Sequence, residues 1–224
     1  MKKNIANFFT IINLFLGVLC IYQCFNSNLI SSAYIVFACF FFDGIDGTVA
    51  RFMKVDCEFG KQLDSFSDFV SFGLAPAFLI FIFFSSQFNN SLSYLFLLIP
   101  VFSAIRLARY NINQKHANKF LGLTTPVNAL IISSIVLIYY FERNELLRNI
   151  IINEYFIIFI VSMSSLMLIS NIETFEIRLD GIFIDRRKLF FIFISLSLLY
   201  IFSFSGMLML LLFYVAFSVL KIIN

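Results

Sequence analysis

Four aspartates gather in a short part of an otherwise apolar chain, and their spacing points to metal chemistry. Asp43 and Asp46 are three residues apart, and Asp64 and Asp68 are four residues apart. On α-helices these spacings place each pair on one face, so two joined helices can aim four carboxylates at one point. An ionised carboxylate in or beside hydrocarbon costs at least about 2.5 kcal/mol, so we expect a cation among them.

The residues around the aspartates indicate which cation and which substrate to expect. Oxygen ligands without a nearby cluster of His or Cys favour a hard ion, Mg²⁺ or Mn²⁺. Mg²⁺ held by carboxylates usually completes its shell with phosphate oxygens, which predicts a phosphorylated or diphosphate substrate. Gly47 and Gly60 would let a ligand approach the helix backbone, and the guanidinium of Arg51 could hold phosphate oxygens. The structural alternative is ion pairing of the aspartates with Arg51, Lys54 and Lys61.

The composition places these residues in a membrane protein. The chain has 224 residues, of which 61% are hydrophobic and 13% charged, and its mean hydropathy is +0.94. The net charge is only +3 and the basic residues are scattered, which excludes the basic patch of a nucleic-acid-binding protein. The four cysteines form no CxxC pair, so we expect free buried thiols.

Apolar runs of about 20 residues divide the chain into about eight membrane helices. We expect an all-α polytopic bundle with helices at residues 7–25, 29–50, 62–86, 91–113, 121–141, 150–171, 188–204 and 207–222. One membrane domain is expected over residues 1–224, in which 1–180 form the core and 181–224 carry a C-terminal helical hairpin.

The basic residues predict the orientation of these helices. Nearly all of them fall at one end of the predicted spans, and only Arg143 and Arg148 fall at the other. Positive charge accumulates on the cytoplasmic side of membrane proteins. We therefore expect both termini and the acidic motif on the cytoplasmic side of the cell membrane.

The acidic motif also resembles a family signature. The string D-x2-D-G-x2-A-R-x8-G-x3-D-x3-D is similar to that of the CDP-alcohol phosphatidyltransferases, and its fixed positions are Asp43, Asp46, Gly47, Ala50, Arg51, Gly60, Asp64 and Asp68. The resemblance implies two metal ions. Their ligands would be Asp43, Asp46 and Asp64 for one ion and Asp43, Asp64 and Asp68 for the other. It also implies that Asp68 is the general base and that the CDP-linked lipid contacts Gly47 and Arg51.

Further segments resemble the phosphatidylserine synthase branch of that family. They are Asn7 to Gly17, Asp68 to Ala77, Arg106 to Asn111 and Gly122 to Pro126. This resemblance implies transfer of the phosphatidyl group from CDP-diacylglycerol to L-serine with release of CMP, in an enzyme that often forms a homodimer within the bilayer. One departure is Cys57, which stands where the family commonly has Ser or Thr and is a weaker hydrogen-bond partner.

Four polar residues outside the acidic motif have two interpretations each. Thr10 and Asn13 are polar in an apolar helix, so they either face the cavity of the CDP-linked lipid or form helix–helix hydrogen bonds. Arg106 and Arg109 could bind the carboxylate of an amino-acid acceptor or the diphosphate, or they could serve membrane topology alone.

Three alternatives to serine transfer stay open at this point. The same chemistry could use glycerol 3-phosphate or inositol phosphate, which would require a second group of cations near Asp68. A cation-coupled transporter would instead place the aspartates near mid-membrane. An inactive assembly subunit is disfavoured, because no catalytic position of the signature is missing.

Overall fold

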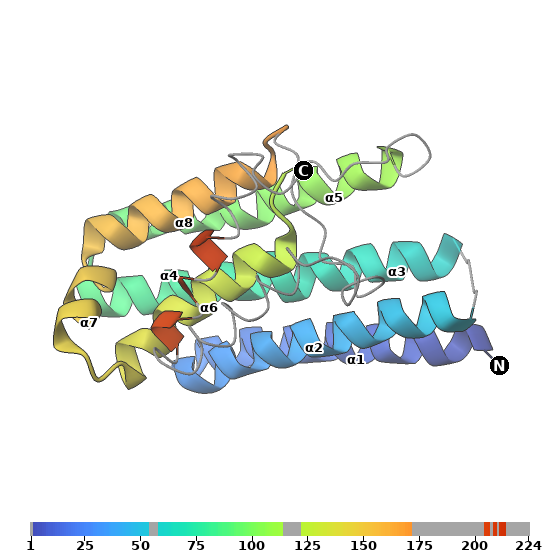
Figure 1. Ribbon diagram of the computed structural model, residues 1–224, viewed down its shortest axis with the longest axis horizontal. Helices are drawn as coiled ribbons and strands as arrows, with labels where there is room; N and C mark the ends of the chain where they lie inside the picture. Colours follow the sequence, from blue (N-terminus) through green and yellow to red (C-terminus); the bar gives the residue numbers. More distant parts are fainter. Residues whose placement is uncertain are drawn as a thin grey trace, which may run out of the picture.

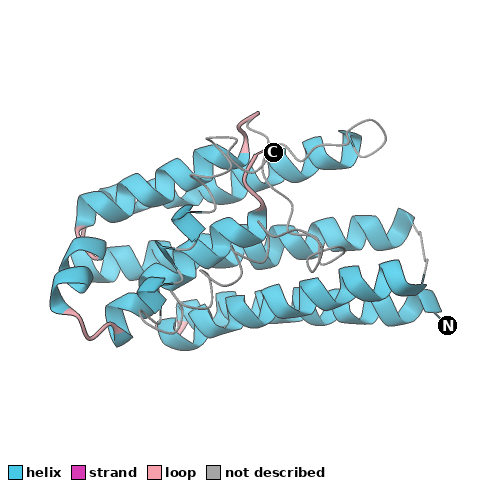
Figure 2. Cartoon of the chain, viewed as in Figure 1, coloured by secondary structure: helices cyan, strands magenta, loops and turns pink. Residues whose placement is uncertain are grey.

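The chain folds as an elongated bundle of helices. The computed structural model describes residues 2–53, 58–113, 122–171, 204–206, 208–209 and 211–213, and all regular structure in these residues is helical (Figure 1, Figure 2). The elements with assigned bounds are α1 (Lys2–Phe25), α2 (Leu29–Met53), α3 (Glu58–Asp68), η1 (Phe69–Leu74), α4 (Ala75–Phe88), η2 (Ser91–Leu98), α5 (Ile99–Asn113), α6 (Thr125–Phe141), α7 (Glu145–Ile151) and α8 (Glu154–Leu168).

Several of these helices are long and apolar enough to cross a membrane. Four candidate spans are found in the described residues: Asn7–Phe25, Leu29–Val49, Glu58–Phe88 and Ser91–Ile112. The pair α7 and α8 gives a fifth if it counts as one bent span. Of the predicted helix 188–204 only residue 204 is described, and of 207–222 only residues 208–209 and 211–213 are described. The described part of the chain is therefore an all-helical membrane bundle with four or five candidate spans.

The third span is one continuous helix with an irregular centre. α3, η1 and α4 follow one another without a break, and η1 is a π-helix that starts directly after Asp68. A π segment widens the helical turn and often lies at a functional site. The predicted span 62–86 is thus extended at its start to Glu58, and it contains an irregularity that hydropathy does not reveal.

The predicted helix 150–171 is wrong as a single element. α7 ends at Ile151, α8 begins at Glu154, and the two helices meet at 60°. The side chain of Asn153 accepts hydrogen bonds from the backbone amides of Tyr155 and Phe156 in the first turn of α8, at 3.0 and 3.3 Å, and so caps a new helix. The predicted helix 121–141 likewise begins later, at Thr125, with Pro126 in its first turn.

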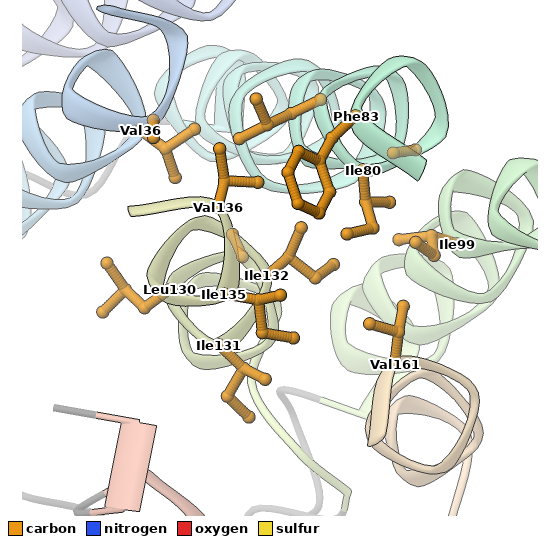
Figure 3. Close-up of a cluster of buried hydrophobic side chains, with 14 of the residues drawn as sticks. Val36, Ile80, Phe83, Ile99, Leu130, Ile131, Ile132, Ile135, Val136 and Val161 are labelled. Atoms are coloured by element: carbon orange, nitrogen blue, oxygen red, sulfur yellow. The ribbon is translucent and has the colours of Figure 1, made fainter. Parts of the chain in front are cut away.

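α6 lies in the centre of the bundle. Every residue from Asn128 to Ile138 is buried. Figure 3 shows α6 side chains, among them Ile132 and Val136, together with Val36 of α2 and Phe83 of α4. The elements that contact α6 are α2, η1, α4, α7 and α8.

The bundle has two opposite ends. The start of α1 and the ends of α2 and α5 lie at one end, together with the start of α3 (Figure 1). We call this the pocket end. α7 and the turns after α1 and α4 lie at the opposite end, which we call the far end (Figure 1).

Candidate metal and diphosphate site

Three carboxylates meet at the pocket end. Asp43 of α2 and Asp64 and Asp68 of α3 each offer one oxygen, and these oxygens all lie within 4.8 Å of one another. The four-residue spacing places Asp64 and Asp68 on the same face of α3. The prediction that two helices direct their aspartates at one point therefore agrees with the geometry for these three residues.

This carboxylate group fits a divalent cation. Unit charges about 4.8 Å apart repel by about 3 kcal/mol per pair at an effective dielectric constant of about 20. Oδ2 of Asp46 and Oδ1 of Asp68 are buried, and neither accepts a hydrogen bond from any described residue. Buried anionic oxygens without donors are costly on their own, and they are the ligands that a hard divalent ion prefers.

Asp46 stands beside this group and is oriented by α1. It lies one turn after Asp43 on α2, and only 6% of its surface is exposed. The hydroxyl of Thr10 donates a hydrogen bond to its carboxylate. Thr10 is itself buried and does not line the pocket described below. Its contact therefore fixes the direction of a candidate metal ligand.

Backbone carbonyls of α1 hold the helix that carries Asp64 and Asp68. Ser67 Oγ donates to the carbonyl of Thr10 at 3.2 Å, and Ser71 Oγ donates to the carbonyl of Asn13 at 3.0 Å. Gly17 makes this approach possible, because a Cβ there would lie 2.5 Å from Ser71 Oγ. The two helices are consequently joined along the faces next to the carboxylates.

The side chain of Asn13 lies inside the bundle and not in the pocket. It is fully buried, and neither of its amide atoms has a hydrogen-bond partner among the described residues. Its carbonyl accepts from Cys39 Sγ at 3.8 Å as well as from Ser71. Of the two interpretations of Asn13, the observed contacts are of the helix–helix kind, through its backbone.

A pocket of about 310 Å³ opens over the carboxylates. Its lining residues are Asp43, Gly44, Asp46, Gly47, Asp64, Asp68, Arg106, Leu107, Tyr110, Thr124 and Pro126. Arg106 is 9% exposed, its Nη1 donates to Thr125 Oγ1 at 3.3 Å, and its positive charge acts on Asp68. The pocket thus combines a carboxylate cluster with a guanidinium, which suits an anionic ligand held through a cation.

Close contacts between η1, α3 and α5 bring Arg106 to this place. A Cβ on Gly73 would lie 3.1 Å from Ser103 Cβ, so the π segment and α5 approach closely one turn before Arg106. Nearer the end of α5, Asn111 Nδ2 donates to Ser65 Oγ at 3.0 Å. These two contacts fix α5 against the helix of the carboxylates.

The remaining predicted site residues are placed differently. Gly47 lines the pocket, whereas Gly60 lies in the first turn of α3 and is not part of the lining. Arg51 belongs to α2, but its side chain and all of Cys57 lie outside the described residues. Arg109 is exposed and donates to a backbone carbonyl at the end of α8 instead of lining the pocket.

Five lining residues were not predicted as site residues. They are Gly44, Leu107, Tyr110, Thr124 and Pro126. Gly44 follows Asp43, and a Cβ there would meet no atom within 4 Å, so it adds open space beside the carboxylates. The other four fall in the segments Arg106 to Asn111 and Gly122 to Pro126, whose resemblance to a family branch was the available signal.

The chain is similar to several enzymes of known name. CDP-diacylglycerol–serine O-phosphatidyltransferase of Helicobacter pylori is 31% identical over 173 residues, which are 75% of this chain and 70% of that protein. The protein of the same name from Methanocaldococcus jannaschii is 35% identical over 130 residues, 58% of each chain. Archaetidylserine synthase of Methanothermobacter thermautotrophicus is 31% identical over 165 residues, 70% of this chain and 63% of that protein.

No solved structure matches the chain. A family profile agrees with the relatives named above. The profile described as CDP-alcohol phosphatidyltransferase matches residues 3–167, which contain all four aspartates and the whole pocket lining. The resemblance of the acidic motif is thereby confirmed. The protein belongs to the CDP-alcohol phosphatidyltransferase family.

Proposed function

We propose that the protein transfers the phosphatidyl group of CDP-diacylglycerol to L-serine, which yields phosphatidylserine and CMP. The observation that carries this proposal is the meeting of Asp43, Asp64 and Asp68 within 4.8 Å, in a pocket that also contains Arg106. The relatives whose names state serine as the acceptor supply the second support.

The carboxylates would hold two divalent ions, Mg²⁺ or Mn²⁺. Asp43, Asp64 and Asp68 would bind one ion, and Asp46 would join Asp43 and Asp64 around the other. Bound ions of this kind neutralise a diphosphate and stabilise charge on the attacking and leaving oxygens. Gly47, with Gly44 beside it, leaves room for the diphosphate along α2. Arg51 would hold phosphate oxygens at the end of the same helix.

The reaction is a displacement at the phosphorus atom that carries the diacylglycerol. The serine hydroxyl oxygen forms the new O–P bond, the bond to the bridging oxygen of CMP breaks, and CMP leaves with that electron pair. Asp68 accepts the hydroxyl proton as general base. Its Oδ1 is buried and accepts no hydrogen bond within the described residues, so a lone pair is available for this proton.

Arg106 supports serine over a phosphorylated acceptor. Among the described lining residues it is the one cationic side chain. One guanidinium can pair with the single carboxylate of serine, whereas glycerol 3-phosphate or inositol phosphate would need more positive charge beside the ions. Arg109 is directed at the end of α8, which leaves Arg106 as the proposed contact for the acceptor carboxylate.

An acceptor screen tests the proposal. The purified protein in detergent, given CDP-diacylglycerol and Mn²⁺ or Mg²⁺, should release CMP with L-serine and much more slowly with glycerol 3-phosphate, inositol phosphate or water. EDTA should abolish the release. A faster reaction with a phosphorylated acceptor would reassign the substrate, and ion flux in liposomes without CMP release would favour a transporter.

The base assignment has its own test. Asp68→Asn removes the proton acceptor and a metal ligand, and we expect CMP release to fall by at least about 10³-fold. Serine-dependent turnover that survives this substitution would overturn the role of Asp68. Saturation with Mn²⁺ in the same assay separates loss of the base from weaker metal binding.

We also propose the setting of the enzyme. The distribution of basic residues supports a cytoplasmic position for the pocket end and both termini, in the cell membrane. The chain is one membrane domain, with residues 1–180 as its catalytic core, about eight spans in all and a C-terminal hairpin in residues 181–224. A homodimer within the bilayer completes this proposal, and cross-linking in native membranes would test it.

A further inference from the structure

The segment of residues 122–126, which we call the rim, closes one side of the pocket through Thr124 and Pro126. Its start is attached to the end of α8. The backbone N–H of Leu123 donates to the carbonyl of Met167 at 2.9 Å. Gly122 has φ +76°, a left-handed conformation that residues other than glycine rarely adopt.

The rim and α8 approach too closely for any side chain at residue 122. A Cβ on Gly122 would lie 2.7 Å from the carbonyl oxygen of Leu168 and 3.0 Å from that of Met167. Backbone atoms on both sides leave little freedom to adjust. The position of the rim therefore depends on the position of the last turn of α8.

Arg109 holds that last turn. Its Nη1 donates to the carbonyl oxygen of Ile169 at 2.9 Å, directly after the end of α8. A cation at a helix C-terminus also interacts favourably with the helix dipole and with carbonyls that lack partners within the helix. α5, which carries Arg109, runs beside α8 (Figure 1).

Arg106 holds the same rim from the pocket side. It lies one turn before Arg109 on α5, and its Nη1 donates to Thr125 Oγ1 at 3.3 Å. α5 thus contacts the rim directly through Arg106. Through Arg109 it contacts the rim indirectly, by way of α8. Arg106 is buried and lines the pocket, whereas Arg109 is exposed.

We propose that Arg109 is a positioning residue, which sets the rim of the pocket by fixing the end of α8 and does not itself touch the substrate. Loss of its guanidinium would let the last turn of α8 move, and Gly122 and Leu123 would move with it. The carboxylates belong to α2 and α3 and do not depend on this chain of contacts. The variant should therefore bind substrate less well and keep most of its maximal rate.

The kinetic test compares two substitutions that should both displace the rim. It rests on the proposed function, because it measures the KM for serine. Arg109→Ala removes the contact from α5, and Gly122→Ala forces the rim away from α8. Each change should raise the KM for serine about tenfold, the equivalent of one charged hydrogen bond, with kcat within about threefold of the wild type. The double variant should add no more than about twofold, because both changes act on one contact.

Two further variants complete the set. Arg109→Lys keeps a charged donor and should return the KM toward the wild-type value. Arg143→Ala removes an exposed arginine at the far end and should change nothing. If the effects of the two substitutions on KM multiply in the double variant, Arg109 binds the ligand directly and the proposal is overturned. An unchanged KM in Arg109→Ala would also overturn it.

Hydrogen exchange tests the same contact without turnover. The Leu123 amide should exchange faster in Arg109→Ala than in the wild type or Arg143→Ala, because its acceptor on Met167 is no longer held. Unchanged exchange at Leu123 would contradict the proposal even if the acceptor proves not to be serine. If Arg109→Ala does not elute as a folded protein, Arg109→Gln takes its place in both measurements.

Discussion

The two ends of the bundle differ in whether buried acidic oxygens are left without hydrogen-bond donors. At the far end, Asn90 donates to Glu154, Tyr139 donates to Gln87, and Arg148 lies 5.3 Å from the ring centre of Tyr139. At the pocket end, the buried oxygens Asp46 Oδ2 and Asp68 Oδ1 accept no hydrogen bond from the described residues. These polar groups of the far end have partners, whereas the two carboxylate oxygens of the pocket end have none among the described residues and suit a bound cation.

This difference distinguishes polar groups that stabilise the fold from polar groups that bind a ligand. Paired polar groups stabilise the fold at little net cost, because each donor meets an acceptor. Like charges gathered without donors destabilise the empty protein, and the same arrangement strengthens the binding of a cation. The carboxylates of the pocket end should therefore lower the stability of the metal-free protein. Replacing one of them should raise that stability, whereas removing a paired polar group at the far end should not.

The sharpest test changes a carboxylate to an amide at each end. Asp64→Asn should lower CMP release by at least about 10³-fold, since a metal ligand is lost. In EDTA the same variant should unfold at a higher temperature than the wild type, because repulsion of about 3 kcal/mol per neighbouring carboxylate disappears.

The matched change at the far end is Glu154→Gln. Its amide oxygen can still accept the hydrogen bond from Asn90, so both activity and thermal midpoint should stay close to those of the wild type. An Asp64→Asn variant that is less stable than the wild type in EDTA would break the comparison, because the cluster would then be structural.

A smaller effect is expected at Thr10, which supports a carboxylate of the pocket end. Thr10→Val removes the hydroxyl that donates to Asp46 and keeps the volume of the side chain. The Mn²⁺ concentration for half-maximal activity should rise about 10- to 100-fold, as for other residues that orient metal ligands. Thr10→Ser keeps the donor and serves as the control. An unchanged requirement for Mn²⁺ in Thr10→Val would show that Asp46 needs no such support.

The smallest effect on activity belongs to the far end. Asn153→Ala removes the cap of α8 and should lower the free energy of unfolding by about 1 kcal/mol. The KM and kcat of the enzyme should not change, because the cap lies at the opposite end from the pocket. Asn153→Asp keeps an accepting side chain and should retain stability. A loss of activity in Asn153→Ala beyond its loss of folded protein would indicate coupling between the ends.

Much of the site was predictable because it depends on spacing within single helices. The separations of Asp43 from Asp46 and of Asp64 from Asp68 fix which side chains share a face, whatever surrounds them. The spans 7–25 and 29–50 were equally clear, since long apolar runs end at the polar turn between them. The family motif added the pocket residues of α5 and of the segment before α6.

The rest depends on contacts that a single sequence does not encode locally. Hydropathy averages over about 19 residues, so one Asn153 does not interrupt the apolar run that it divides into two helices. The amino-acid composition of the π segment, residues 69–74, does not distinguish it from an ordinary helix. The different roles of Arg106 and Arg109 follow from the position of α8, which is far from both in the sequence.

The burial of α6 has a consequence for how the protein is made. Every residue from Asn128 to Ile138 is buried in the finished bundle, and the helix is shorter than the candidate membrane spans. At 17 residues it is about 25 Å long, shorter than a typical hydrocarbon core of about 30 Å. We therefore expect α6 to depend on its neighbours for its place in the membrane, on α2 and α4 before it in the chain and on α8 after it. A bundle assembled without α6 would leave the inward faces of α2, α4 and α8 without their common packing partner.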